Sequence, residues 1–389
     1  MVFPDPAPAK TKRGPPLYVT AAFCSGLRSD RIDIMEKDQI NSNTPKALPQ
    51  QRKFWAGIGI ILIVILVLIS PLIIADAIFR RAGVEGYREV VKSFISPQYS
   101  EIKSNSGRVN LLILGKGGKG HEGADLTDTM IFASLSLKAH SITLVSIPRD
   151  IWVPEIRAKI NSAYYWGNIQ PGRGGGLNFA KQIVSEITGQ PIDYALAIDF
   201  SGFQDIIDTI GGIDVNVDRS FTDTKYPIAG KENDTCVGDP TFACRYKTIH
   251  FEQGINHMNG ATALEFVRSR EGDNGENTDF ARSARQQKII TAVGAKTLSF
   301  GTIIDPVKDY KILLAVKASV ETDLSPNAAG ILGNTVISSR NNMNSQVLPI
   351  DLLVNPPISS TYDKQYVFIP KAGNGNWGDI NKWFSGVLN

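Results

Sequence analysis

The sequence predicts an α/β fold, a layered αβα domain with a mixed central sheet, preceded by one transmembrane helix. Three observations support this prediction. The run VNLLIL, at residues 109–114, has the length and composition of a buried strand. Two further β-rich runs follow it, TMIFASLSL and SITLVSI, separated by the turn-like KAH. Beyond them helix-like and strand-like runs alternate, which is typical of a layered α/β domain.

The later elements are expected in a fixed order. A helix near 177–188 precedes a strand, DYALAIDF, a helix, SGFQDIIDTI, and a strand, IDVNV. After residue 300, DYKILLAVKASV and SPNAAGILGNTVISS are helix-like, whereas SQVLPI and YVFIP are strand-like. Because we find neither a repeat nor a linker in this part, residues 106–389 are predicted to form one domain, with the core motifs within 109–290.

An uncharged apolar run precedes this domain, from Phe54 to Ala75. A helix of this length spans roughly 30 Å, the thickness of a bilayer core. A cleaved signal peptide is the alternative, although its apolar core is usually about 7–15 residues long and close to the N-terminus. We therefore expect a transmembrane helix at 54–75 and a partly helical linker over 76–105.

The charges that flank this run predict its orientation. Residues 1–53 are rich in lysine and arginine, which favours a cytoplasmic location, whereas Arg80 and Arg81 on the far side weaken this bias without reversing it. The expected topology is a single pass through the cytoplasmic membrane, with the N-terminus inside and the C-terminal domain outside. The tail is Pro-rich without apolar periodicity, which predicts disorder, and Met35 is an alternative start to Met1.

Net charge and cysteine usage restrict the function further. The chain has 389 residues and a net charge of +3, too small for wholesale nucleic-acid binding. Cys236 and Cys244 lie in a polar loop, where a disulfide is plausible in an oxidising compartment. A metal site is the weaker alternative, because His250 and His257 lack the usual ligand spacing.

The most informative motif is FVRSREGDNGENTDFARSARQQ. Arg268 and Arg270 are two residues apart, so their side chains share one face of a strand or extended turn. On a helix, Arg282, Arg285 and Gln286 also share one face. Guanidinium groups bind phosphate oxygens in a bidentate manner, so the two faces together predict a site for a phosphate-bearing anion. The alternative is a solvated, salt-bridged helix surface.

A glycine-rich loop, GKGGKG, follows the first strand at residues 115–120. It matches G-x-G-x-x-G, but a loop and a strand follow where a dinucleotide site requires a helix. A Walker P-loop also fails, because Gly120 follows Lys119 where serine or threonine is required. We expect a flexible or anion-facing loop, with Lys116 and Lys119 as neighbours of a phosphate.

Three further charged residues lie near strand ends. Asp128, in LTDTM, lies where the loop enters a strand, and a turn or cap role is the alternative. Arg149 and Asp150, in SIPRD, end the next strand, at the kind of edge where open α/β sheets bind ligands. A salt bridge between these two residues is the alternative.

Together the segments resemble the LytR–CpsA–Psr family of bacterial cell-envelope proteins. The motifs that carry the resemblance are LTDTM, SIPRD, KINSAYYWG, PIDYALAIDFSGFQDIIDTIGGIDVNV, MNGATALEFVRSR and DFARSARQQ, in this order. They cover about residues 109–290 strongly and the remainder weakly. One membrane anchor followed by an outer domain is also the usual layout of that family.

The resemblance implies a phosphotransferase at the outer face of the cytoplasmic membrane. Such an enzyme transfers a glycopolymer from a polyprenyl-pyrophosphate carrier to peptidoglycan, through a phosphodiester link. The implied partners are the lipid-linked glycan, the peptidoglycan acceptor and membrane lipid, without nucleic acid. Hydrolysis of the same lipid pyrophosphates and a non-catalytic, membrane-anchored envelope regulator or binding protein are the alternatives.

The resemblance also implies roles for single residues. Asp128 would help to hold Mg²⁺ or another divalent cation, and Asp128 or Asp279 would serve as base, while Arg149 would contribute to catalysis. The lipid tail would lie in an apolar tunnel that runs such as Asp199–Ile210 line. The expected pyrophosphate-binding residues, extended by neighbours in the same motifs, are Arg149, Arg268, Arg270, Arg282, Arg285, Gln286 and Lys119.

One departure from the family bears on the metal. Many members carry an aspartate and an arginine just after the first strand, where Gly117 and Lys119 stand in this chain. A metal ligand is therefore expected to be missing. Glu122, Asp125, His121 or a water would have to compensate for it.

Overall fold

The computed structural model describes residues 86–118, 123–231, 233–297 and 306–388. The chain divides into two compact units, Met1–Ile63 and Val64–Asn389, and every described residue belongs to the second. Within the described ranges no helix is long and apolar enough to cross a membrane. The predicted tail, the predicted transmembrane segment at 54–75 and the first part of the linker lie outside them.

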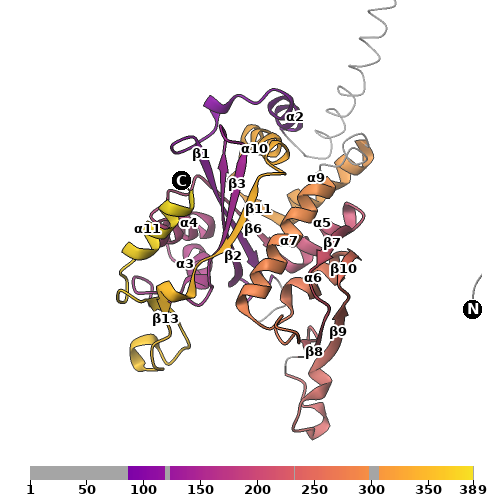
Figure 1. Ribbon diagram of the computed structural model, residues 1–389, viewed down its shortest axis with the longest axis vertical. Coiled ribbons are helices and arrows are strands. Elements are labelled where there is room, and N and C mark those ends of the chain that lie inside the picture. The colour runs from indigo at the N-terminus through magenta and orange to yellow at the C-terminus, as the bar shows by residue number, and fades with distance from the viewer. Residues whose placement is uncertain (1–85, 119–122, 232, 298–305, 389) are drawn as a thin grey trace, which may run out of the picture. The chain divides into compact units, whose positions relative to one another are not determined.

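A six-stranded sheet forms the centre of the fold (Figure 1). Its strands lie in the order β11-β6-β1-β2-β3-β12. β1 pairs antiparallel with β2 and parallel with β6, β3 pairs antiparallel with β2 and parallel with β12, and β11 pairs antiparallel with β6. The predicted mixed sheet is confirmed. The strands are β1 (Arg108–Lys116), β2 (Thr127–Ser136), β3 (Ser141–Ser146), β6 (Tyr194–Asp199), β11 (Val320–Thr322) and β12 (Met343–Val347).

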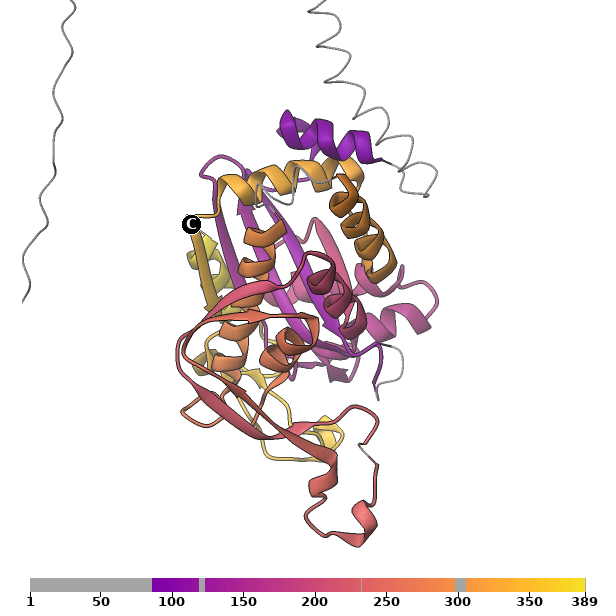
Figure 2. The same cartoon turned by 90° about the vertical axis from the view of Figure 1, so that its right-hand side faces the viewer.

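Helices cover both faces of this sheet (Figures 1 and 2). Side chains alternate along β1, so Leu112 and Leu114 enter one core while Val109, Leu111 and Ile113 enter another. The first core contains α3 (Ala163–Ile169), α4 (Gly176–Thr188) and α11 (Gly378–Leu388). The second core contains α10 (Pro326–Ser338), against which α2 (Tyr87–Ile95) packs.

A third core lies beside the sheet. It combines residues of α5 (Phe200–Thr209), α6 (Gly260–Arg268), α7 (Asp279–Thr297) and α9 (Pro306–Ser319) with the strand pairs β7–β10 and β8–β9. Asp199 caps α5 and Asn259 caps α6, because their side-chain oxygens accept hydrogen bonds from the backbone N–H groups of Gly202 and Thr262. The paired strands are β7 (Ile213–Val217) with β10 (Gly254–Met258) and β8 (Phe221–Pro227) with β9 (Tyr246–Phe251).

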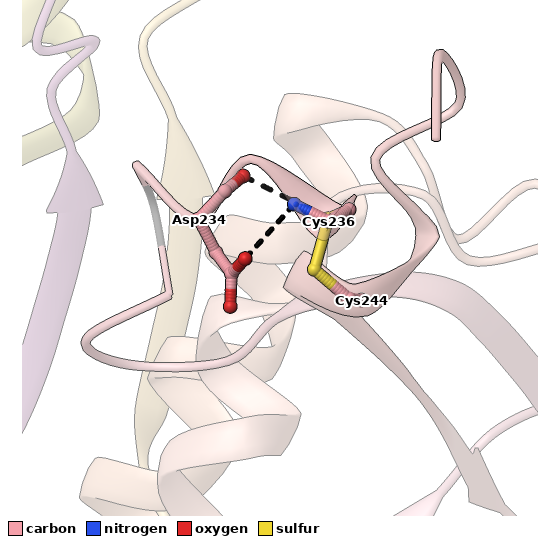
Figure 3. A group of neighbouring side chains, drawn as sticks. All are labelled: Asp234, Cys236 and Cys244. Atoms are coloured by element: carbon pink, nitrogen blue, oxygen red, sulfur yellow. Dashed lines mark hydrogen bonds between the residues drawn. A yellow bond between two sulfur atoms is a disulfide. The ribbon is translucent and has the colours of Figure 1, made fainter. Parts of the chain in front are cut away.

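The β8–β9 connection carries the cysteines. A disulfide joins Cys236 and Cys244, whose Cα atoms lie 5.5 Å apart (Figure 3). The backbone N–H of Cys236 also donates to Asp234 Oδ1 at 2.9 Å. Because both sulfur atoms are used in the disulfide, neither is available as a thiolate ligand.

The remaining short elements connect or extend these layers. β4 (Trp152–Val153) pairs with β5 (Ala158–Lys159), and β13 (Leu353–Val354) pairs with β14 (Ile369–Pro370). The 3₁₀ turns are η1 (Tyr99–Glu101), η2 (Ile160–Ser162), η3 (Cys236–Gly238), η4 (Ala243–Arg245), η5 (Ile350–Leu352) and η6 (Ser360–Tyr362). The predicted strand YVFIP is therefore reduced to the two residues of β14.

Candidate active site

A cavity of about 470 Å³ lies between the sheet and helices α5, α6 and α7. Its floor is formed by Ile113, Gly115 and Ile131 of the sheet, and Ile289 and Ile290 of α7 form part of its wall. The basic side chains that line it come from four separate segments. They are Arg149, Lys225, Arg268, Arg270 and Arg282.

Arg149 follows the end of β3 and is held by acidic neighbours. Its Nη1 lies 2.5 Å from Asp128 Oδ1 on β2, and its Nε lies 3.4 Å from Asp150 Oδ2. Lys159 Nζ binds the other oxygen of Asp150 at 2.6 Å. Burial lowers the pKa of Arg149, but the two carboxylates outweigh burial and leave this pKa above its ordinary value. Arg149 is thus a fixed positive charge at the edge predicted from SIPRD.

Arg268 and Arg270 reach the cavity from the end of α6. The Arg268 guanidinium lies over the ring of Phe200, 4.3 Å from its centroid. Burial lowers the pKa of Arg270, and the positive charges of Arg149 and Arg282 lower this pKa further. Three guanidinium groups therefore repel one another in a partly desolvated place. An anion bound among them would relieve this repulsion.

Asp223 of β8 positions this arginine segment, a role that the sequence reasoning missed. The Asp223 side chain is 1% exposed, and its Oδ2 accepts from Ser269 Oγ at 2.7 Å and from the N–H groups of Arg270 and Glu271 at 3.1 and 3.2 Å. The signal was the two-residue period of β8, which places Asp223 on the same inward face as Phe221.

Helix α7 supplies the opposite wall of the cavity. Arg282 and Gln286 are four residues apart and both line it, and Gln286 Nε2 donates to Thr129 Oγ1 at 3.0 Å. Asp279 is the first residue of this helix, and its side chain lies outside the described part of the structure. Lys119, His121 and Glu122 also lie outside it.

The prediction that Arg285 binds phosphate is wrong. Its side chain is 3% exposed, and its donors bind Phe266 O, Ser269 O and the Glu276 side chain at 2.5–2.8 Å. A three-residue step along α7 turns it toward the core, whereas the four-residue step from Arg282 keeps Gln286 in the cavity. Arg285 holds the turn that carries Arg270.

The residues considered for the metal fall in two places. Lys116 and Asp125 form an ion pair at 3.6 Å outside the cavity lining, and Lys116 Nζ also lies 3.0 Å from Tyr164 OH. Asp128 lines the cavity, and its side chain is 40% exposed beside its ion pair with Arg149. Mg²⁺ commonly takes only one or two carboxylates beside phosphate oxygens and water, so Asp128 fits a metal held jointly with a phosphate.

A second cavity of about 610 Å³ adjoins the first. Ile113 of β1 and Ile290 of α7 line both, so they mark the junction. The second cavity continues over the sheet toward α10, and its lining is mostly aliphatic, with Thr291, Arg340 and Asn341 as its polar residues. Of the run expected to line a tunnel, Asp199, Phe200 and Phe203 border the first cavity, whereas Ile207 and Ile210 belong to the third core.

Comparison with known proteins identifies the class of protein that this fold and site define. The LytR_cpsA_psr family model matches residues 83–374, so the chain belongs to that family. The family resemblance in the motifs is confirmed.

Individual relatives bear names. A Bacillus cereus protein, polyisoprenyl-teichoic acid–peptidoglycan teichoic acid transferase TagU, is 30% identical over 230 residues, which cover 58% of this chain and 64% of the relative. A protein of the same name from Oceanobacillus iheyensis is 28% identical over 317 residues, which cover 78% and 87%. The matched segment thus spans less than two thirds of the Bacillus relative.

Solved structures share the fold. The crystal structure of TagV from B. subtilis is 25% identical, with a TM-score of 0.50 over 73% of this chain and 98% of the other. The Lin1025 protein from Listeria innocua is 23% identical, with a TM-score of 0.51 over 73% of this chain and 100% of the other.

Proposed function

We propose that this protein transfers a glycopolymer from a polyprenyl-pyrophosphate carrier to peptidoglycan, through a phosphodiester link. One observation carries the proposal: an arginine-lined cavity adjoins an aliphatic one, and Ile113 and Ile290 line both. This arrangement complements a molecule with a multiply charged anionic head and a long hydrocarbon tail. Both named relatives are polyisoprenyl-teichoic acid–peptidoglycan teichoic acid transferases, which supports the same chemistry.

The reaction is a displacement at phosphorus. A hydroxyl of the acceptor attacks the glycan-side phosphorus, and a new P–O bond forms as the bond to the bridging oxygen breaks. Polyprenyl phosphate leaves with that oxygen, and the hydroxyl proton passes to a carboxylate. Asp128 lies at the site for this role, and Asp279 is the second candidate.

The arginines stabilise the charge that develops on the leaving phosphate. They are fixed before the reaction, Arg149 by Asp128 and Asp150 and Arg270 by the Asp223-bound turn. Preorganised donors of this kind favour the transition state more than the ground state. Divalent metal, held by Asp128 together with phosphate oxygens, would neutralise part of the same charge. Because Gly117 supplies no carboxylate, the guanidinium groups carry a larger share of this work in the present chain.

We also propose where the protein acts. The uncharged run at 54–75 would anchor the chain once in the cytoplasmic membrane, and the domain would act at its outer face, where lipid-linked precursors and peptidoglycan meet.

The test uses the full chain in proteoliposomes, with a synthetic polyprenyl-pyrophosphate disaccharide, uncrosslinked peptidoglycan and either Mg²⁺ or EDTA. Arg149→Ala is expected to reduce transfer by roughly 10²–10³-fold, the usual cost of one fixed donor at a developing charge. Arg157→Ala is the control, because Arg157 pairs with Asp363 at the surface at 2.9 Å. Full activity of Arg149→Ala would refute this site, and release of the free glycan phosphate with or without acceptor would identify a hydrolase instead.

A further inference from the structure

Next to the arginines lies a third and smaller space, a cleft of about 50 Å³, to which no role has been assigned above. This cleft and the arginine-lined cavity share four lining residues, which are Asp128, Arg149, Arg282 and Gln286. The other residues of the two spaces come from opposite parts of the sheet. The arginine-lined cavity extends over β1 and β6, whereas the cleft is bordered by the ends of β3 and β12. Strand β2 lies between these two parts of the sheet.

This arrangement matters because of the geometry of phosphoryl transfer, in which the attacking and leaving oxygens lie roughly in line on either side of phosphorus. If the polyprenyl tail occupies the aliphatic cavity, the leaving phosphate lies on the side of the arginines that faces the junction at Ile113 and Ile290. The attacking hydroxyl must then arrive from the side away from this junction, and neither Ile113 nor Ile290 lines the small cleft. The small cleft opens on that side.

The rim of the cleft has exposed apolar surface. Phe280 of α7 is 47% exposed, and Ile350 and Phe368 complete the rim. Tyr366, 52% exposed, makes an edge contact with Phe368 at a centroid distance of 5.4 Å. We call Phe280, Tyr366 and Phe368 the aromatic shelf. A contiguous group of exposed apolar side chains beside polar residues is typical of a binding surface.

The shelf is held rigidly against the catalytic edge. The backbone N–H of Phe368 donates to Asp150 O at 2.9 Å, and Trp152 N–H donates to Phe368 O at 2.8 Å. On the other side, Gln287 Nε2 of α7 donates to Gln346 O of β12 at 2.9 Å. The shelf thus keeps a fixed position relative to Arg149.

We propose that the aromatic shelf is the subsite for the acceptor, a glycan strand whose hydroxyl attacks phosphorus. Pyranose rings present flat C–H faces that stack on aromatic rings, while their hydroxyls bind charged and amide side chains. The shelf supplies the rings, and Asp128, Arg149 and Gln286 in the adjoining cleft supply the polar groups. This inference rests on the proposed function and assigns its second substrate to named residues.

The test compares Phe280→Ala and Tyr366→Ala with Tyr165→Ala. Tyr165 is also an exposed tyrosine with an edge contact at 5.4 Å to one aromatic ring, but it lies on α3, away from the cleft. Each shelf variant is expected to raise the KM for uncrosslinked peptidoglycan glycan chains by about three- to tenfold, the range of a lost aromatic contact. The KM for the lipid donor should stay unchanged, as should both constants of Tyr165→Ala. Phe280→Trp should restore the acceptor KM, which separates stacking from misfolding.

Two results would overturn the inference. An unchanged acceptor KM in both shelf variants excludes the subsite, and a raised donor KM assigns the shelf to the sugars of the donor instead. Binding of the same glycan chains to the wild type and the variants, measured without donor, distinguishes this failure from failure of the proposed function. If the wild type shows no transfer, a loss of glycan binding in the shelf variants still supports the shelf, and equal binding still refutes it.

Discussion

Asp223→Asn tests whether a buried carboxylate positions the arginines. Asp223 Oδ2 accepts three hydrogen bonds, from Ser269 Oγ and from two backbone N–H groups, and Oδ1 accepts from Lys225 N–H at 2.9 Å. Charge-assisted hydrogen bonds are about twice as strong as neutral ones, so three weakened bonds cost about 1 kcal/mol each. If the amide keeps its oxygen toward these three donors, its NH₂ group faces the Lys225 N–H. The expected loss in the free energy of unfolding is about 3 kcal/mol, a large fraction of the total of about 5–15 kcal/mol that is usual for native proteins.

The assay is urea unfolding, together with the KM for the lipid donor. We expect Asp223→Asn to fold, to unfold at lower urea and to raise the donor KM, because the turn that carries Arg270 loosens. Asp214→Asn is the control, since Asp214 makes an exposed pair with His257 at 2.7 Å. Wild-type stability and a wild-type donor KM in Asp223→Asn would refute the positioning role.

Two further predictions concern the cavities and the pH dependence. Gly294 lines the aliphatic cavity and has open space where a side chain would begin. Gly294→Leu should therefore exclude long polyprenyl tails while leaving turnover of short-chain donors intact. An equal loss of turnover with both donors would contradict this prediction. Burial raises the pKa of Tyr226, which means that the folded state holds its proton more tightly than the unfolded chain does. The stability that this group contributes is therefore present below the ordinary pKa of 10.0 and is lost as the pH rises past it. Tyr226→Phe should flatten the decline of the urea midpoint at alkaline pH. A decline as steep as that of the wild type would contradict the assignment.

Much of the sheet could be predicted from the sequence because its strands are continuous apolar runs, as in the segment from Val109 to Leu114. The pairing of β3 with β12 could not be predicted, because it joins segments just over 200 residues apart and no local pattern encodes it. At the site, the strand-end position placed Arg149 correctly at the edge. Arg285 was misassigned because the helical spacing in the sequence does not show whether Arg282 or Arg285 faces the core.

Helix α7 fixes the distances between the three regions proposed to bind the substrates. Along one continuous helix, Phe280 belongs to the aromatic shelf, Arg282 and Gln286 line the arginine-lined cavity, and Ile290 and Gly294 line the aliphatic cavity. At 1.5 Å per residue, Phe280 and Gly294 are about 21 Å apart. In the proposed reaction, this helix sets the spacing between the phosphate head and the lipid tail of the donor and the acceptor glycan. Inserting one residue near its middle would rotate everything beyond by about 100°, taking the tail contacts out of register with the phosphate contacts.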